Sequence, residues 1–210
     1  FDDVPIAAAS IAQVHRARLF SGEEVAVKVR RPGLEQVIGT DLEILRGLAS
    51  LLEENAPELR AYAPAEIVEE FARAITLEID LSHEASNMQR FARNFAGDPL
   101  VHVPKLYEAY SKPAVLTMEF VRGIKAKDLA GLDAAGIDRK KLAAGGVEFC
   151  LRQVFDHGFF HADPHPGNLF ARPGGGVALI DFGMVGEIGG DLRDQLVEPV
   201  ARLTTDRPGP

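Results

Sequence analysis

The residues best suited to chemistry lie in one short segment of the second half of the chain. His161–Asn168 places a carboxylate, Asp163, five residues before an amide, Asn168, and Asp181 follows within Asp181-Phe182-Gly183. Mg²⁺ prefers oxygen ligands and keeps water and phosphate oxygens in its shell, so Asn168 and Asp181 would suffice as its protein ligands. Asp163 would then orient an attacking hydroxyl or water. These residue types predict metal–nucleotide chemistry.

The spacing of these residues is that of phosphoryl-transfer enzymes. Protein kinases combine a catalytic-loop Asp, an Asn four or five residues later and the carboxylate of an Asp-Phe-Gly motif. Asp-Phe-Gly alone is a weak signal, and a proline-rich turn with solvated side chains is the simplest alternative. The joint spacing favours the catalytic interpretation. A metal-hydrolase cluster of imidazoles around Asp163 is a further alternative, and it would use His157, His161 and His165.

A second candidate is Lys28, which ends the segment Val25-Ala26-Val27-Lys28. Valines on a period of two predict a half-buried strand, with Lys28 on the face opposite Val27 and Val29. In kinases, such a strand lysine contacts the α- and β-phosphates of the nucleotide. The alternative is a solvent-facing lysine on a two-sided hairpin, but the downstream motif favours the phosphate contact.

A third candidate precedes the lysine strand, where a kinase has its glycine-rich phosphate loop. Here the residues are Ala7, Ala8, Ala9 and Ser10. Each Cβ narrows the allowed backbone angles and keeps the chain from closing tightly on phosphates. We therefore expect this loop to bind a nucleotide differently from a protein kinase. The sequence has no Gly-x-x-x-x-Gly-Lys segment, which excludes a P-loop NTPase.

These candidates must be positioned by a mixture of strands and helices. Hydrophobic periodicity and Gly/Pro punctuation predict strands at 11–19 and 25–30 around a Ser21-Gly22 turn, helices at 34–52, 65–95 (broken near Thr76) and 142–157, and strands at 101–110, 114–121 and 177–180. This order predicts an α+β protein in two lobes, an N-lobe of residues 1–121 and a C-lobe of residues 122–210.

Composition narrows the class of protein. The 210 residues are 46% hydrophobic and 26% charged, which is ordinary for a globular protein with a core. A net charge of −8 argues against a nucleic-acid partner. The single cysteine, Cys150, cannot form an internal disulfide, which fits a reducing cytoplasm, and buried packing is its expected role. No apolar run is long enough for a transmembrane helix.

Four segments together resemble the UbiB family, the atypical protein-kinase-like proteins linked to coenzyme Q biosynthesis. They are the alanine loop leading to Gln13-Val14-His15, Val25–Gly33, Glu78–Asn87 and His161–Asn168. The resemblance implies a two-lobed protein-kinase-like fold, with a small lobe of β-strands and helices and a larger, mainly helical lobe. The family's N-terminal Lys-x-Gly-Gln signature is absent, so we expect the family domain to be truncated at both ends.

The resemblance also implies roles for individual residues. Lys28 would bind phosphate and pair with Glu84 on a helix equivalent to the kinase αC. Glu78 and Asp80 would form the family's Glu-x-Asp motif near the active site. The backbone from Glu119 to Val121 would be the hinge that meets adenine, alongside the alanine loop.

By this resemblance the chain binds ATP and Mg²⁺ and acts as an ATPase or a kinase of a small-molecule or lipid-like acceptor, supporting isoprenoid quinone (ubiquinone) biosynthesis. It also allows peripheral membrane association through flanking segments of the full-length protein. Two rivals are a small-molecule kinase of the aminoglycoside- or choline-phosphorylating type and a nucleotide-binding pseudokinase without turnover. The alanine loop argues against the first rival, and the presence of all catalytic positions argues against the second.

Overall fold

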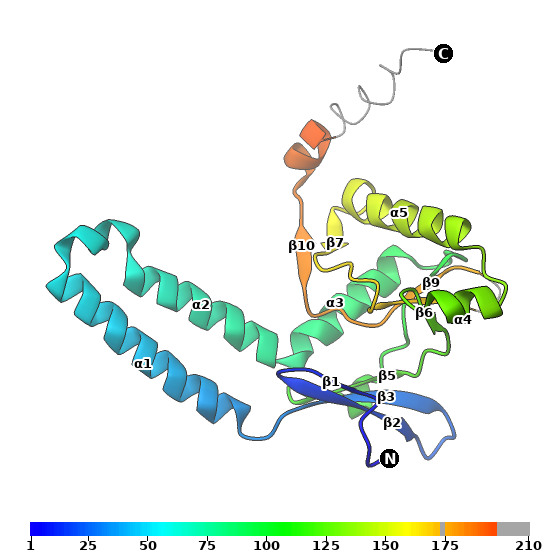
Figure 1. Ribbon diagram of the computed structural model, residues 1–210, viewed down its shortest axis with the longest axis horizontal. Helices are drawn as coiled ribbons and strands as arrows, with labels where there is room; N and C mark the ends of the chain where they lie inside the picture. The colour runs from blue at the N-terminus through cyan, green and yellow to red at the C-terminus, as the bar shows by residue number, and fades with distance from the viewer. Residues whose placement is uncertain (173–174, 197–210) are drawn as a thin grey trace. The chain divides into compact units, whose positions relative to one another are not determined.

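The computed structural model describes residues 1–172 and 175–196 (Figure 1). The chain forms two units: the first contains residues 1–86 and 106–120, and the second contains residues 87–105 and those from 121 onward. Each unit has its own sheet and its own buried side chains, and each is described separately below. Together the elements make a mixed α+β fold.

The first unit is built on a four-stranded antiparallel sheet. Its strands are β1 (Ala7–Ala8), β2 (Ala12–Arg18), β3 (Glu24–Arg30) and β5 (Val115–Glu119), in the order β1-β2-β3-β5. The expected hairpin of β2 and β3 is confirmed, and Gly22 turns it with a φ of 100°, which only glycine adopts without strain. Val25 of β3 and Leu116 of β5 are fully buried and anchor these two paired strands.

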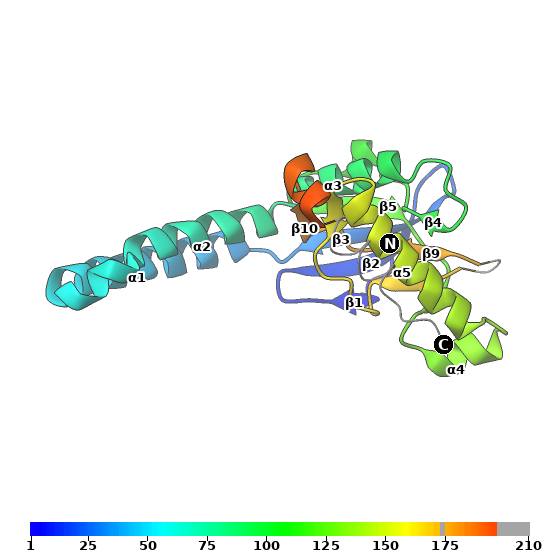
Figure 2. The same ribbon diagram turned by 90° about the horizontal axis from the view of Figure 1, so that it is seen from above.

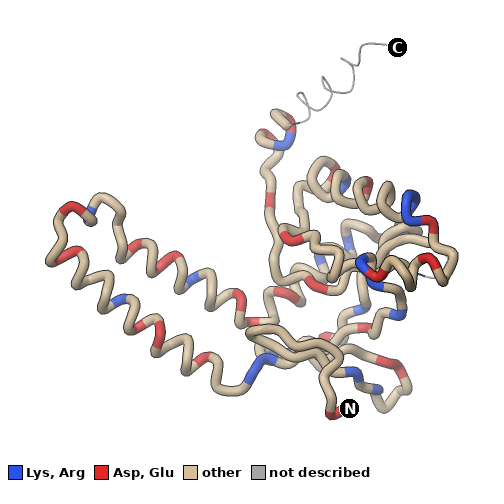
Figure 3. The backbone as a smooth tube through the Cα atoms, viewed as in Figure 1, with Lys and Arg blue, Asp and Glu red and all other residues tan. Residues whose placement is uncertain are grey.

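A helical hairpin follows β3 in the first unit. Helix α1 (Leu34–Asn55) leads through a 3₁₀ turn, η1 (Pro57–Tyr62), to α2 (Pro64–Ile79), and the two helices run antiparallel (Figures 1 and 2). Small and apolar side chains between them are buried, namely Leu42, Ala49 and Ala72. The hairpin is strongly acidic: residues 34–79 contain ten Asp or Glu and three Lys or Arg (Figure 3).

The break in the long helical stretch lies at Asp80, not near Thr76 as expected. Thr76 is accommodated in α2 because its hydroxyl donates to the Ala72 carbonyl at 2.7 Å. Asp80 adopts an extended backbone, and its Oδ1 accepts the Ser82 N–H at 2.8 Å. A carboxylate in this position caps the following helix, α3 (Leu81–Asn94), so a new helix begins there.

The second unit contains the C-terminal part of α3 with two further helices, α4 (Leu129–Ala134) and α5 (Arg139–Phe155). Its strands form a four-stranded sheet in the order β4-β9-β8-β6 and a two-stranded pair of β10 and β7. They are β4 (Val101–His102), β6 (Ile124–Lys125), β7 (Phe159–His161), β8 (Leu169–Ala171), β9 (Val177–Leu179) and β10 (Val185–Glu187).

Phenylalanine rings form the centre of the second unit. Phe91 is completely buried and lies 5.0 Å from Phe159 and 5.3 Å from Phe182, measured between ring centroids. Phe95, the residue directly after α3, packs against Phe149 of α5. Aromatic pairs at these separations add to the stability gained from burial alone. The cluster ties α3, α5 and the strand ends of the unit together.

Two expected elements differ from the structure. Of the strand expected at 101–110, only Val101–His102 forms, and a 3₁₀ turn, η2 (Glu108–Tyr110), occupies the end of that range. The strand stops early because Pro104 has no N–H to donate to a neighbouring strand. The helix expected from Leu142 begins earlier, at Arg139, because Asp138 caps it through the Lys140 and Lys141 N–H groups. Among the described residues, no helix has the length and hydrophobicity needed to cross a membrane.

Candidate active site

Lys28 and Glu84 meet within the first unit. The Lys28 ammonium donates to Glu84 Oε2 at 2.7 Å, joining β3 to the first turn of α3. Glu84 is 4% exposed and the Lys28 side chain is 14% exposed. Lys28 is therefore not the solvent-facing lysine of the alternative interpretation. The contact fixes the direction of a long, otherwise mobile side chain.

Asp80 and Glu78 lie at the junction of α2 and α3. Burial alone would raise the pKa of Asp80, but hydrogen bonds from the Ser82 backbone and hydroxyl outweigh it and hold the pKa below its ordinary value. Glu78 is exposed at the end of α2. The structure thus gives Asp80 a capping role, whereas Glu78 has no hydrogen-bond or ion-pair partner among the described residues.

The alanine loop forms the edge of the first unit's sheet. Ala7 and Ala8 pair with Val14 and Gln13 of β2, and the Ala9 N–H donates to the Ala12 carbonyl at 2.9 Å to close the turn. All residues from Ala7 to Ser10 are exposed. At the other end of the sheet, Glu119 ends β5, and the chain passes into the second unit between Phe120 and Val121.

In the second unit, His161 organises the catalytic-loop segment. Its Nδ1 accepts the Asp163 N–H at 3.1 Å, so its Nε2 must carry the proton and donates to the Asp181 carbonyl at 2.7 Å. The His161 backbone N–H in turn donates to the buried Gln153 side chain of α5 at 2.7 Å. One buried imidazole therefore connects the backbone of Asp163 to that of Asp181.

Asn168 and Asp181 are adjacent through the β8–β9 pair. Leu169 lies opposite Leu179, and the Ile180 N–H donates to the Asn168 carbonyl at 3.1 Å. Asn168 directly precedes β8, and Asp181 comes shortly after the end of β9. Because the two strands are antiparallel, both candidate metal ligands lie at the same end of the pair. Asp181 Oδ1 also accepts the Gly183 N–H at 3.1 Å, which orients its carboxylate. An amide and a carboxylate at one end of a hairpin are a donor set that suits Mg²⁺.

Phe182 anchors the Asp181-Phe182-Gly183 segment. Its ring is completely buried against Phe91, and its carbonyl accepts the Asn87 side-chain amide at 2.9 Å. Asn87 and Phe91 lie one turn apart on α3, so one face of this helix holds both the backbone and the ring of Phe182. This restricts where Asp181 can point.

The metal-hydrolase alternative does not fit this geometry. Both ring nitrogens of His161 are used in hydrogen bonds, and Nδ1 of His165 accepts the Gly167 N–H at 3.0 Å. In the described part of the chain, no three His, Cys, Asp or Glu side chains are grouped so that they could bind a metal together. Cys150 is half-buried, and burial raises the pKa of its thiol, which disfavours the nucleophilic thiolate.

Sequence reasoning missed the residues that support the site. Gln153 and Asn87 are polar residues on otherwise ordinary helices, and only their contacts with His161 and Phe182 reveal their role. His161 was visible as the first residue of a His-x-Asp pattern, but its two hydrogen bonds were not. The signal for Gln153 would have been an amide placed next to Phe149 on an apolar face.

The fold and this arrangement of residues define a kinase-like protein. The model of the ABC1 atypical kinase-like domain matches residues 1–207. The chain therefore belongs to the ABC1 atypical kinase-like family, which confirms the resemblance to UbiB proteins.

Named relatives agree with this assignment. Over 202 residues the chain is 46% identical to the protein ACTIVITY OF BC1 COMPLEX KINASE 8, chloroplastic, of Arabidopsis thaliana, covering 94% of this chain and 26% of that protein. Over 170 residues it is 47% identical to a probable protein kinase UbiB of Cellvibrio japonicus, covering 81% and 31% respectively. The chain thus spans only about a quarter to a third of these relatives.

A solved structure shares the fold. The complex of Rv3197 with erythromycin from Mycobacterium tuberculosis matches with a TM-score of 0.74 and 30% sequence identity, covering 90% of this chain and 47% of that one. The elements described above therefore form a fold that is also seen in a structure solved by experiment.

Proposed function

We propose that this chain binds ATP with Mg²⁺ and transfers or hydrolyses its γ-phosphate. The observation that carries the proposal is the buried Lys28–Glu84 pair, together with a loop in which His161 ties Asp163 to Asp181. A buried ion pair adds little stability compared with apolar packing of the same volume. The Lys28–Glu84 pair is therefore poorly explained by stability alone.

Each residue has a role in this proposal. Phosphoryl transfer needs mainly positioning and charge neutralisation. Lys28, held by Glu84, would bind the α- and β-phosphates, and Asn168 and Asp181 would hold the metal. Asp163 would accept a hydrogen bond from the attacking hydroxyl or water and orient it. A bound Mg²⁺ would supply neutralisation of the phosphate charge.

The nucleotide would also need a binding surface for its base and phosphates. We assign the adenine to the backbone between Glu119 and Val121 and the phosphates to the edge formed by Ala7–Ser10. The exposed, hydrogen-bonded turn of the alanine loop supports this, because its backbone is accessible from solvent. Glu78 and Asp80 would lie near the site, as the family motif implies.

The acceptor is proposed from kinship. Relatives are named as probable protein kinases of the UbiB type, and the resemblance to that family implies a link with isoprenoid quinone synthesis. A small-molecule or lipid-like acceptor, or water, fits this link better than a protein acceptor. Support for ubiquinone biosynthesis is accordingly the cellular role we propose.

The decisive experiment compares ATP hydrolysis by the wild-type chain and by Asp163→Asn, with and without Mg²⁺. We expect Asp163→Asn to reduce turnover by at least about 100-fold, because a positioned base contributes about 10²- to 10⁴-fold, while Mg-ATP still binds. Asp191→Asn, an exposed carboxylate in the same unit, should keep wild-type turnover. Equal rates for wild type and Asp163→Asn would instead favour a nucleotide-binding protein without turnover.

A further inference from the structure

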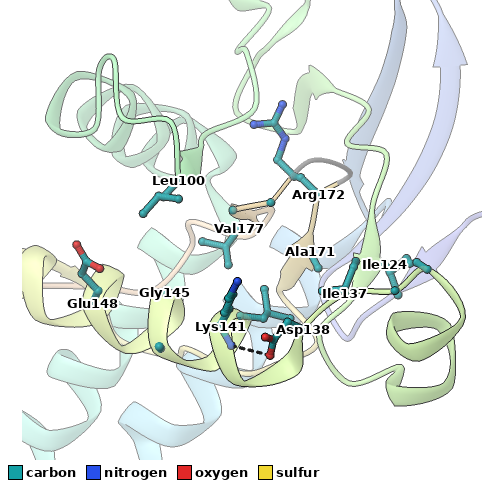
Figure 4. Close-up of a pocket in the computed structure, with 16 residues that line it drawn as sticks. Leu100, Ile124, Ile137, Asp138, Lys141, Gly145, Glu148, Ala171, Arg172 and Val177 are labelled. Atoms are coloured by element: carbon teal, nitrogen blue, oxygen red, sulfur yellow. Dashed lines mark hydrogen bonds between the residues drawn. The ribbon is translucent and has the colours of Figure 1, made fainter.

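The second unit contains a cavity of about 790 Å³ that the proposed catalysis does not use. It lies between the first half of α5, the loop preceding that helix, and the β8–β9 pair (Figure 4). Asp163, Asn168 and Asp181 are not among its lining residues. Most of its wall is apolar, with Leu100, Ile124, Ile137, Leu142 and Val177 as the larger side chains. Small-molecule sites typically enclose about 300–1,000 Å³ with mainly apolar walls.

Glycine keeps one wall of this cavity open. Gly145 lies in the middle of α5, where glycine is the poorest helix former apart from proline. A Cβ on Gly145 would meet no atom within 4 Å, so no close packing of the protein requires a glycine there. The neighbouring Gly146 is equally open but does not line the cavity. The sequence therefore gives up helix stability at a position where a side chain would fill the space.

Two basic residues, Lys141 and Arg172, line this apolar space, and Lys141 points into it. Figure 4 shows Lys141 extending from α5 towards Val177, while Glu148 lies at another edge beside Leu100. Asp138, a lining carboxylate just before α5, caps this helix by accepting the Lys140 and Lys141 backbone N–H groups. In the described ranges, 1–172 and 175–196, the Lys141 ammonium forms no ion pair. An anionic group is the natural partner for it.

We propose that this cavity binds an apolar small molecule with one anionic head group, of the class of long-chain carboxylates. The chain of the ligand would lie against Gly145 and the apolar wall, and its carboxylate would contact Lys141. This site is separate in its residues from the proposed nucleotide site. Its ligand would not take part in phosphate transfer through any of the residues named above.

The test is a calorimetric titration with dodecanoate, below its micelle concentration, on wild type and on two matched pairs of variants. Gly145→Leu fills the cavity, whereas Gly146→Leu places the same side chain outside it. Lys141→Gln removes the proposed cation, whereas Lys140→Gln removes its exposed neighbour. We expect one saturable site in wild type, at least about tenfold weaker binding in Gly145→Leu and about fivefold weaker binding in Lys141→Gln, and controls within about twofold of wild type.

Several outcomes would overturn the proposal. These are no saturable binding of dodecanoate, unchanged affinity in Gly145→Leu, or equally tight binding of dodecyltrimethylammonium, which has the same chain with a cationic head. Thermal unfolding checks that Gly145→Leu is folded. Lys141→Gln tests the same site without this concern, because Lys141 is exposed and its replacement should not affect folding. Mg-ATP binding, measured on the same variants, should stay unchanged, which separates failure of this proposal from failure of the proposed function.

Discussion

Glu84 and Lys28 are the ionic pair on which the first unit's part of the site depends. Both side chains are largely removed from solvent, and their atoms are 2.7 Å apart. Removing one partner of such a pair leaves the other charge in a poorly solvated position, which costs much more than the intact pair contributes. The pair therefore links stability and nucleotide binding at one position.

Replacing Glu84 by Gln should lower the free energy of unfolding by about 3 kcal/mol and weaken Mg-ATP binding, because Lys28 loses its charged partner. Urea unfolding and the thermal shift with Mg-ATP measure the two effects. The matched control is Glu70→Gln, which removes a carboxylate from an exposed pair with Arg73 and should change neither. Wild-type stability in Glu84→Gln would contradict the prediction.

Asp98 gives the second unit a defined pH dependence. Burial alone would raise its pKa, but hydrogen bonds from the Leu100 N–H and the Arg152 guanidinium outweigh it and hold the pKa below its ordinary value. A carboxyl with a lowered folded pKa stabilises the protein fully above its unfolded pKa of about 4, and this stabilisation is lost as the pH falls through the folded pKa.

We therefore expect Asp98→Asn to lower the melting temperature at about pH 7, and this difference to shrink as the pH falls below about 4. Melting curves of both proteins across this range provide the measurement. Asp156→Asn removes a more exposed carboxylate that also faces Arg152, and it should have the smaller effect at every pH. A difference for Asp98→Asn that stays constant into acid would show that its charge is not the cause.

At the scale of the elements, two features are unusual: the α1–α2 hairpin exposes apolar side chains, and α5 contains glycines in its interior. The hairpin exposes an apolar face, with Val37, Ile44, Leu48, Ile67 and Phe71 each more than half exposed. Its polar face contains the Arg46–Glu69 pair at 2.6 Å. Some apolar residues of the hairpin are thus buried between α1 and α2, whereas others are exposed to solvent. Helix α5 instead contains two adjacent glycines whose Cβ positions are open.

Gly146→Ala should raise the free energy of unfolding by about 1 kcal/mol, because alanine favours a helix and a Cβ there meets no neighbouring atom. Gly136→Ala, just before α5, is the informative contrast. Its surroundings are equally open, but its φ of +67° disfavours any side chain, so it should destabilise by about 1 kcal/mol. Changes of the same sign in both variants, measured by urea unfolding, would contradict this account.

At the scale of the whole molecule, the residues with a role in the proposed function are divided between the two units. Lys28 and Glu84 belong to the first, whereas Asp163, Asn168 and Asp181 belong to the second. In the proposed function the first set binds phosphate, and the second set orients the nucleophile and holds the metal. Binding should therefore act on segments that are far apart in the sequence.

Hydrogen exchange measured with and without Mg-ATP tests this directly. We expect protection to increase both in β2–β3 of the first unit and in residues 167–172 and 175–183 of the second. ATP without Mg²⁺ should protect the residues of the second unit less, because Asn168 and Asp181 act through the metal. The α1–α2 hairpin serves as the internal control and should not change. Protection confined to one unit would contradict the roles proposed for the residues of the other unit.

Several features could be predicted because they depend on short-range chemistry. The alternating valines around Lys28, the Ser21-Gly22 turn and the spacing of Asp163, Asn168 and Asp181 each arise within a few residues, where steric preference and periodicity act. The short strands β6, β7, β8 and β10 were missed because two or three residues hold too few alternations to form a pattern. Their pairing comes from distant segments instead.

The sequence alone determined the family, the candidate ligands and the main helices, since residue type and local spacing carry that information. Only the folded chain decided that Lys28 is buried against Glu84, that one imidazole connects Asp163 to Asp181, and that Gly145 borders a cavity. The reason is physical: burial, hydrogen-bond partners and empty space depend on which distant segments pack together, and no local pattern records that choice.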